Sequence, residues 1–194
     1  MRIIAGAWRG RRIRFPAVAD LRPTPDRVRE TLFNWLQGVV VDARCLDLFA
    51  GSGALGLEAL SRGASRTVFV EQDRSAAEAL AGTLETLRAP QGQVVREDAF
   101  RYLARPSTPF DIVFLDPPFA KGWLIELCTL LEAGGWLAPR AFIYLEARAR
   151  EAIGPLPSSW EALRETRAGD VHGVLARRAP AAGAAAAASD QGTT

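Results

Sequence analysis

Short apolar runs alternate with amphipathic segments along most of this chain, beginning near residue 43. The apolar runs are rich in Val, Ile, Leu and Phe, which favours buried strands. Strands are expected at 45–49, 67–71, 93–96, 110–115 and 141–146, and helices at 54–62, 74–88, 99–104 and 122–132. Strands that alternate with helices predict an α/β fold, in which a parallel sheet is covered by helices on both faces.

The pattern changes after residue 146. Residues 161–167 and 171–177 flank Gly169-Asp170 with no helix between them, which predicts an antiparallel hairpin. Residues 179–194 are rich in alanine and low in complexity, which indicates a disordered tail, with a frayed helix as the alternative.

The first 40 residues form a block of their own. Residues 2–15 alternate loosely and contain Gly6 and Gly10, which favours a small β-hairpin. A helix is expected to begin with Thr24 as its N-cap and Pro25 in its first position, and to end at Gly38. The predicted organisation is an N-terminal hairpin and helix at 1–40, a main domain at 41–178 and a tail at 179–194.

Composition narrows the chemistry. A chain of 194 residues can bury a sizeable core, and its apolar runs are too short for a transmembrane helix. Cys45 and Cys128 are expected to be buried free thiols in a reducing cytoplasm. One histidine and two distant cysteines do not supply the usual ligands of a zinc site, so no metal is expected.

Charge is unevenly distributed. Residues 1–29 contain eight arginines and two aspartates, a balance of +6, whereas the remaining residues sum to −4. This asymmetry indicates a surface that binds a polyanion, although a solvated arginine-rich surface would have the same composition. The arginines expected to contact phosphates are Arg9, Arg11, Arg12 and Arg27.

A glycine-rich loop joins the first strand of the main domain to the next helix. The segment from Asp47 to Gly56 contains G-x-G-x-x-G, which allows a tight turn and the close approach of a ligand to the backbone. The loop residues expected to bind a nucleoside cofactor are Asp47, Phe49, Ala50, Gly51, Ser52 and Gly53.

Acidic residues follow the next two strands. Glu71 comes 20 residues after Gly51, at a strand end where a carboxylate accepts hydrogen bonds from ribose hydroxyls. Asp98 is placed either to bind the exocyclic amine of adenine or to cap the following helix. The glycine loop and Glu71 alone fit both NAD and S-adenosylmethionine.

Asp116-Pro117-Pro118-Phe119 follows the apolar run 110–115. Proline lacks an N–H and fixes φ, so the strand must end in a rigid corner. This corner offers a carboxylate, carbonyl oxygens and an aromatic ring, which suits an amine on a planar base. The only lysine is Lys121 and no Tyr–Lys pair is present, so methylation with S-adenosylmethionine is favoured over a dehydrogenase.

These segments together resemble the RsmD family of bacterial methyltransferases. The similarity runs from residue 1 to about residue 178, and it includes segments 1–6, 8–11, 21–24, 26–36, 46–63 and 114–119. Asp-Pro-Pro-Phe alone indicates an amino methyltransferase, and the N-terminal segments narrow the resemblance to this family. The resemblance implies a class I S-adenosylmethionine-dependent methyltransferase fold, which is Rossmann-like, with a seven-stranded, mostly parallel sheet and an antiparallel last strand. It also implies methylation of the exocyclic N2 of a guanine in 16S ribosomal RNA, in an assembled or assembling small subunit. The segment 170–174 departs from the family because it lacks the tyrosine that often follows the valine.

The catalytic residues expected from this comparison are Asp116, Pro117, Pro118 and Phe119. Hydrogen bonds from N2–H to the Asp116 carboxylate and the Pro117 carbonyl would direct the nitrogen lone pair, and Phe119 would stack on the base. Three alternatives stay open: an amino methyltransferase acting on adenine N6 in DNA or on another RNA, an RNA-binding module without activity, and an NAD oxidoreductase. A cytoplasmic monomer that has no membrane partner is expected.

Overall fold

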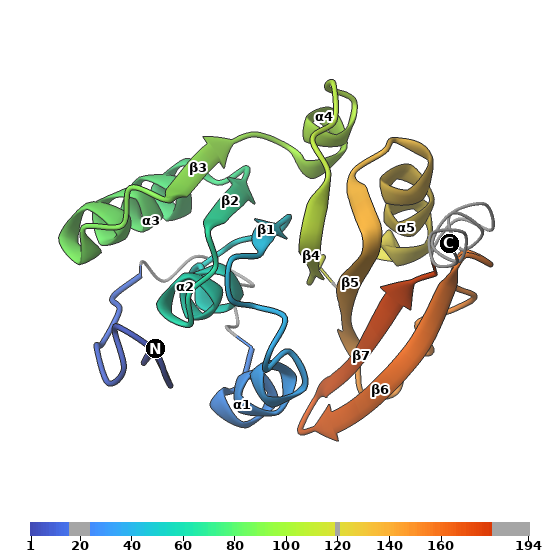
Figure 1. The fold of residues 1–194 in the computed structure, drawn as a ribbon, viewed down its shortest axis with the longest axis horizontal. Coiled ribbons are helices and arrows are strands. Elements are labelled where there is room, and N and C mark those ends of the chain that lie inside the picture. Colours follow the sequence, from blue (N-terminus) through green and yellow to red (C-terminus); the bar gives the residue numbers. More distant parts are fainter. Residues whose placement is uncertain (16–23, 119–120, 180–194) are drawn as a thin grey trace, which may run out of the picture.

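The computed structural model describes residues 1–15, 24–118 and 121–179, which form a seven-stranded sheet flanked by helices (Figure 1). The strands are β1 (Arg44–Asp47), β2 (Arg66–Glu71), β3 (Gly92–Arg96), β4 (Phe110–Leu115), β5 (Leu137–Arg148), β6 (Trp160–Ala168) and β7 (Val171–Arg178). The helices are α1 (Asp26–Trp35), α2 (Ala54–Ser61), α3 (Arg74–Leu87), α4 (Ala99–Leu103) and α5 (Leu124–Ala133). The predicted alternation of strands and helices is therefore confirmed.

The strand order in the sheet is β3-β2-β1-β4-β5-β7-β6. β1 pairs in parallel with β2 and β4, β2 pairs with β3, and β4 pairs with β5. β7 is antiparallel to both of its neighbours, which confirms the expected antiparallel last strand. The order changes direction between β1 and β4, and ligands of open α/β sheets bind beyond the carboxyl ends of strands at such a point.

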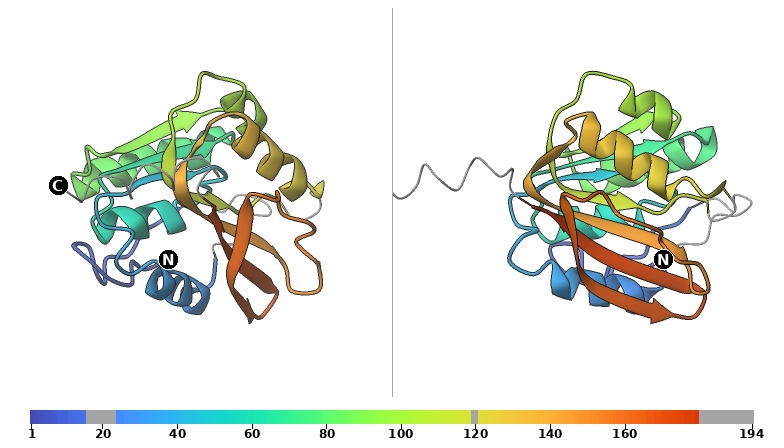
Figure 2. Two further views of the ribbon diagram at one scale, coloured as in Figure 1. Left: turned by 45° about the vertical axis from the view of Figure 1, so that its right-hand side comes forward. Right: turned by 90° about the vertical axis from the view of Figure 1, so that its right-hand side faces the viewer.

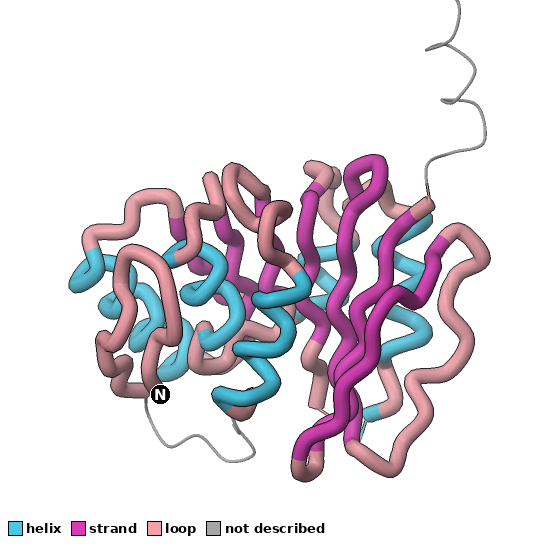
Figure 3. The backbone as a smooth tube through the Cα atoms, turned by 60° about the horizontal axis from the view of Figure 1, so that its bottom comes forward, coloured by secondary structure: helices cyan, strands magenta, loops and turns pink. Residues whose placement is uncertain are grey.

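Helices cover both faces of the sheet (Figures 2 and 3). α1, α2 and α3 contribute to one buried cluster, and α4 and α5 contribute to a second cluster on the other side. Alternate residues of β4 belong to the two clusters, with Ile112 and Phe114 in the first and Val113 and Leu115 in the second. This burial on both faces explains why the sequence of β4 is an almost unbroken apolar run.

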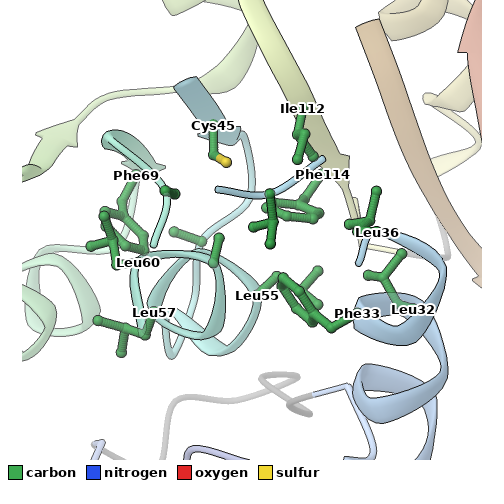
Figure 4. Packing of buried hydrophobic residues seen from close by; sticks show 14 of the residues in the cluster. Leu32, Phe33, Leu36, Cys45, Leu55, Leu57, Leu60, Phe69, Ile112 and Phe114 are labelled. Atoms are coloured by element: carbon green, nitrogen blue, oxygen red, sulfur yellow. The ribbon is translucent and has the colours of Figure 1, made fainter. Parts of the chain in front are cut away.

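The first cluster joins α1 and α2 to the sheet (Figure 4). The rings of Phe33 in α1 and Phe114 in β4 lie 5.9 Å apart between centroids. α2 approaches the sheet closely at Gly56, where a Cβ atom would lie 2.2 Å from a ring carbon of the buried Phe69. Cys45 and Cys128 are buried free thiols, as expected.

The N-terminal residues form a short hairpin that packs along α2. Arg2 and Arg12 form an antiparallel bridge, and backbone hydrogen bonds on either side of it join residues 1–3 to residues 10–13. The segment is anchored to α2 through hydrogen bonds from the backbone N–H groups of Ile4 and Ala5 to the Glu58 carboxylate, at 2.8 and 3.0 Å.

Two local predictions were wrong. The N-cap of α1 is Pro25, which makes no side-chain capping bond, whereas the hydroxyl of Thr24 donates to Glu146 of β5 at 3.1 Å. β5 begins at Leu137, before the expected residue 141, and the register of its pairing with β4 shifts near Arg140, whose φ is 64°. A proline at 139 and this irregularity hid the first part of the strand from a sequence pattern.

The tail predicted at 179–194 lies outside the described residues, apart from Ala179. The predicted division between residues 1–40 and 41–178 stays a prediction, although contacts between the two parts are extensive. Ile3, Ile13 and the apolar side chains of α1 belong to the same buried cluster as those of α2.

Candidate active site

The glycine loop follows β1 and is fastened to both neighbouring strands. Leu48 N donates to the carbonyl of Phe114 at 3.2 Å, and Ala50 N donates to the carbonyl of Val70 at 2.9 Å. Gly51 and Gly53 have φ values of 51° and 74°, which favour glycine. At Gly53 a Cβ atom would also lie 2.5 Å from Leu80, so the loop is built tightly against α3.

Asp47, the last residue of β1, is buried and contacts the start of α2, which follows the glycine loop. Its Oδ2 accepts a hydrogen bond from Gly56 N at 2.9 Å. Burial raises the pKa of Asp47 to about 7, the Gly56 hydrogen bond lowers it, and the charge of Glu71 raises it further. This hydrogen bond holds the start of α2 in place, and the expected role of Asp47 in binding the cofactor stays a prediction.

Glu71 and Asp98 occupy the carboxyl ends of β2 and β3. Glu71 accepts hydrogen bonds from Gly51 N at 2.8 Å and from Asp73 N at 2.7 Å, so its carboxylate lies against the glycine loop. Asp98 caps α4 by accepting from the N–H groups of Phe100 and Arg101 through Oδ1. The capping alternative for Asp98 is thus realised, and its role in binding the adenine amine stays a prediction.

Three aromatic side chains gather beside these carboxylates, and sequence reasoning identified only the first. Phe49 of the glycine loop stacks with Trp123 at 6.4 Å between centroids, and Phe100 meets the same ring edge-on at 5.2 Å. The Lys121 ammonium lies 5.7 Å from the Trp123 ring. Trp123 therefore connects the loop to the chain that follows the proline corner.

Asp116 stands half-buried at the carboxyl end of β4, with Pro117 buried and Pro118 exposed. Phe119 lies outside the described residues. Burial, followed by the negative charges of Glu146 and Asp47, raises the pKa of Asp116 well above its ordinary value. The structure thus brings Asp116 together with the glycine loop, because β1 and β4 are adjacent strands.

Glu146, two residues before the end of β5, was missed by the sequence analysis. It is buried, and its Oε2 accepts hydrogen bonds from the Tyr144 hydroxyl at 3.0 Å and the Thr24 hydroxyl at 3.1 Å. Burial raises the pKa of Glu146 to about 7 against the lowering effect of these two hydrogen bonds. The available signal was an acidic residue at the end of a predicted parallel strand, the same signal that pointed to Glu71 and Asp116.

The four candidate phosphate-binding arginines, Arg9, Arg11, Arg12 and Arg27, are all exposed. Arg29, which contributed to the basic balance of the N-terminal segment, is instead fully buried beside Glu58. The charge of Arg29 is therefore paired with Glu58 in the interior, and the exposed positive charge of the N-terminal segment is smaller than its composition suggests.

In the described part of the chain, no group of three or more His, Cys, Asp or Glu side chains is arranged to hold a metal ion. None of the helices in those residues combines the length and the apolar character needed to cross a membrane.

Known proteins with similar sequences cover almost the whole chain. The family model described as Conserved hypothetical protein 95 matches residues 1–177. Ribosomal RNA small subunit methyltransferase D of Escherichia coli strain K12 is 52% identical over 171 residues, which cover 88% of this chain and 86% of the relative. The protein of the same name from Haemophilus influenzae is 44% identical over 177 residues, which cover 88% of this chain and 90% of the relative.

Solved structures of other proteins have the same fold. The Escherichia coli protein yhhF superposes with a TM-score of 0.86 at 49% identity, over 92% of this chain and 98% of that chain. SMU.776, solved in complex with SAH, shares the fold at 16% identity, with a TM-score of 0.66 over 81% of this chain and 50% of that chain. The fold is therefore that of class I methyltransferases, and the match of family model and relatives shows that the chain belongs to the RsmD family, the family of ribosomal RNA small subunit methyltransferase D.

Proposed function

We propose that this protein transfers the methyl group of S-adenosylmethionine to the exocyclic N2 of a guanine in the 16S ribosomal RNA of the small subunit. The observation that carries the proposal is the position of Asp116 and Pro117 beside the glycine loop, to which β4 is hydrogen-bonded through the Phe114 carbonyl. The names of the two relatives support small-subunit ribosomal RNA as the substrate.

The charge of the site supports S-adenosylmethionine as the cofactor. The loop residues 47–53 include no lysine or arginine. The loop contains Asp47, the Glu71 carboxylate accepts a hydrogen bond from Gly51 N, and Asp98 follows the next strand of the sheet. A cofactor with a positively charged sulfur and an amino group is attracted by such a site, whereas the pyrophosphate of NAD would be repelled. When bound, S-adenosylmethionine supplies an activated methyl group, and Glu71 and Asp98 would hold its ribose and adenine.

Asp116 and Pro117 would orient the target amine. The lone pair of guanine N2 is delocalised into the ring, and hydrogen bonds to the Asp116 carboxylate and the Pro117 carbonyl would favour a pyramidal nitrogen. As N2 gains the methyl group it gains positive charge, which the carboxylate stabilises and then relieves by accepting a proton. The raised pKa of Asp116 suits it for accepting that proton.

The remaining parts of the proposal concern the RNA. Arg9, Arg11, Arg12 and Arg27 would contact phosphates, since all four are exposed. Phe119 would stack on the target base, which must be unpaired or everted to reach Asp116. The enzyme would act as a monomer in the cytoplasm, where small subunits assemble.

Transfer of a tritiated methyl group tests the proposal. Small subunits and 16S RNA from cells that lack the endogenous family member, and a DNA control, would each be incubated with the protein and digested to nucleosides. Label in N2-methylguanosine is expected from the subunits. Label on adenine, or on DNA alone, would contradict the guanine assignment and favour the adenine N6 alternative.

A variant isolates the role of Asp116. Asp116→Ala is expected to lower the transfer rate by about 100-fold or more, because it removes the group that stabilises the developing charge. Binding of S-adenosylhomocysteine, followed by calorimetry, should change little. Glu126→Gln, on the exposed side of α5, is a matched control that should keep full activity.

A further inference from the structure

We propose that Glu146 accepts a hydrogen bond from N1–H of the target base and thereby makes the site selective for guanine. The inference rests on the proposed function, because it concerns the base whose amine Asp116 holds. It adds a specificity-determining residue from a strand that the sequence motifs do not include.

The register of the sheet places Glu146 beside Asp116. β4 and β5 are parallel, and their last paired positions are Phe114 with Tyr144 and Leu115 with Leu145. The next residue of each strand is Asp116 and Glu146, and neighbouring strands are about 4.8 Å apart. Since alternate side chains share a face, both carboxyl groups lie on the face of Phe114 and Tyr144, which is the face covered by α1.

Hydrogen bonds hold Glu146 in a fixed position. The hydroxyls of Tyr144 and Thr24 both donate to Oε2, and these two residues are 0% and 4% exposed. Oε1 is the oxygen to which neither hydroxyl donates, and the proposal assigns it to the base. Glu146 itself is 2% exposed, so the base must enter the site and displace its covering contacts, and a hydrogen bond formed there is shielded from water.

The raised pKa of Glu146 is consistent with a carboxyl group that lacks a further hydrogen-bond donor. Burial raises the pKa of Glu146 to about 7, although two hydroxyls already donate to it. Burial and then the charge of Glu146 raise the pKa of Asp116, in agreement with the neighbouring positions that the strand register gives to the two carboxyl groups. A donor from the base would stabilise the charged form of the carboxylate.

The two purines present opposite groups to a carboxylate at this point. In guanine the methylated amine N2 is next to N1–H, a donor, whereas in adenine the amine N6 is next to a bare N1, an acceptor. Glu146 would therefore attract guanine and repel adenine, which adds an unfavourable contact against the wrong base. Asp116 and Pro117 alone recognise an amine and cannot make this distinction.

2-Aminopurine separates the two hydrogen-bonding roles, because it has the N2 amine of guanine and the bare N1 of adenine. Small subunits would be reconstituted from ligated 16S RNA that carries either guanine or 2-aminopurine at the nucleotide labelled by the wild-type protein. Wild-type protein is expected to prefer guanine by about 10- to 100-fold in kcat/KM, the value of one hydrogen bond to a charged group. Glu146→Gln should reduce this ratio to about 1, because an amide can also donate to the bare N1.

Two controls separate specificity from folding. Glu126→Gln makes the same substitution on the exposed side of α5, and it should leave the ratio of the rates on the two bases unchanged. Binding of S-adenosylhomocysteine should be equal in wild-type protein and Glu146→Gln. The wild-type ratio is itself a test that needs no variant.

Three results would overturn the inference. A wild-type ratio near 1, or an unchanged ratio in Glu146→Gln, would contradict it while the proposed function stands. Absence of any methylguanine with wild-type protein would refute the proposed function, and the inference with it.

Discussion

The guanidinium of Arg29 in α1 lies 3.7 Å from the carboxylate of Glu58 in α2, and both side chains are fully buried. The same carboxylate accepts hydrogen bonds from Ile4 N, Ala5 N and the Nε of Arg62. Arg29 in turn donates to the carbonyl of Arg2 at 2.9 Å. One buried acidic residue thus joins the N-terminal segment, α1 and α2, and it sets how the basic residues lie relative to the active site.

Glu58→Ala is expected to destabilise the protein by about 3–5 kcal/mol. It removes the buried carboxylate nearest to the Arg29 guanidinium, leaves only the exposed Asp26 as its ion-pair partner, and removes the acceptor of two backbone N–H groups. Urea unfolding followed by circular dichroism would measure the change. Glu78→Ala removes the partner of Arg74 in an exposed ion pair and should have no measurable effect. Equal stability of the two variants would contradict the role assigned to Glu58.

The sequence pattern predicted the sheet, the flanking helices and the glycine loop because these depend on local alternation and on glycine spacing. The sequence pattern did not indicate the burial of Arg29 and Glu58, because a charged residue in an amphipathic helix normally faces solvent. Thr24 shows the same limit. A threonine before a proline has the local signature of a helix cap, but its partner, Glu146, is 122 residues away.

The sequence analysis identified those candidate site residues that stand at recognisable spacings after predicted strands, and it missed the others. Gly51, Glu71 and Asp116 follow separate strands, and parallel pairing brings them to one edge of the sheet. Glu146 and Trp123 belong to the same edge, but their roles depend on side-chain contacts with Thr24, Tyr144 and Phe49 that no spacing reveals.

Gly56→Ala should destabilise the protein, because the added Cβ would lie 2.2 Å from a ring carbon of Phe69, which is fully buried. Overpacking of a rigid core costs about 1–3 kcal/mol. Gly82→Ala is a matched control in α3, where a Cβ would meet nothing within 4 Å. It should stabilise the protein by about 1 kcal/mol through helix propensity. Thermal unfolding would detect the opposite signs, and two shifts in the same direction would contradict the close approach at Gly56.

Asp47→Asn tests the buried carboxyl group under the loop. Burial raises the pKa of Asp47 from 3.8 to about 7 in the folded protein. Between these values the folded state binds more protons than the unfolded state, so the unfolding free energy falls as pH rises through this window. The full effect of Asp47 would be roughly 4 kcal/mol, and Asp116 and Glu146 act in the same direction.

Unfolding in urea at pH 5 and pH 8 would measure this dependence. The loss of stability between the two pH values should be smaller in Asp47→Asn than in wild-type protein, whereas the exposed control Glu126→Gln should leave it unchanged. The asparagine can still accept the hydrogen bond from Gly56 N, so the loop is kept. A pH dependence equal to that of wild-type protein would show that Asp47 keeps its ordinary pKa.

Arg9, Arg11 and Arg12 lie exposed on the segment that Glu58 anchors, and the proposed function assigns them to RNA phosphates. Each phosphate contact releases counterions, so Arg11→Ala should weaken binding to small subunits and lower the slope of log K against log salt by about 0.7–0.9. The triple alanine variant should lower that slope by about 2–3. Filter binding over a series of KCl concentrations would measure the slope.

Arg101→Ala, which changes an exposed arginine of α4, should leave the slope unchanged, because α4 packs on the opposite face of the sheet from the N-terminal segment. Equal slopes for Arg11→Ala and Arg101→Ala would show that the RNA binds elsewhere, and would separate the location of the RNA surface from the chemistry at Asp116.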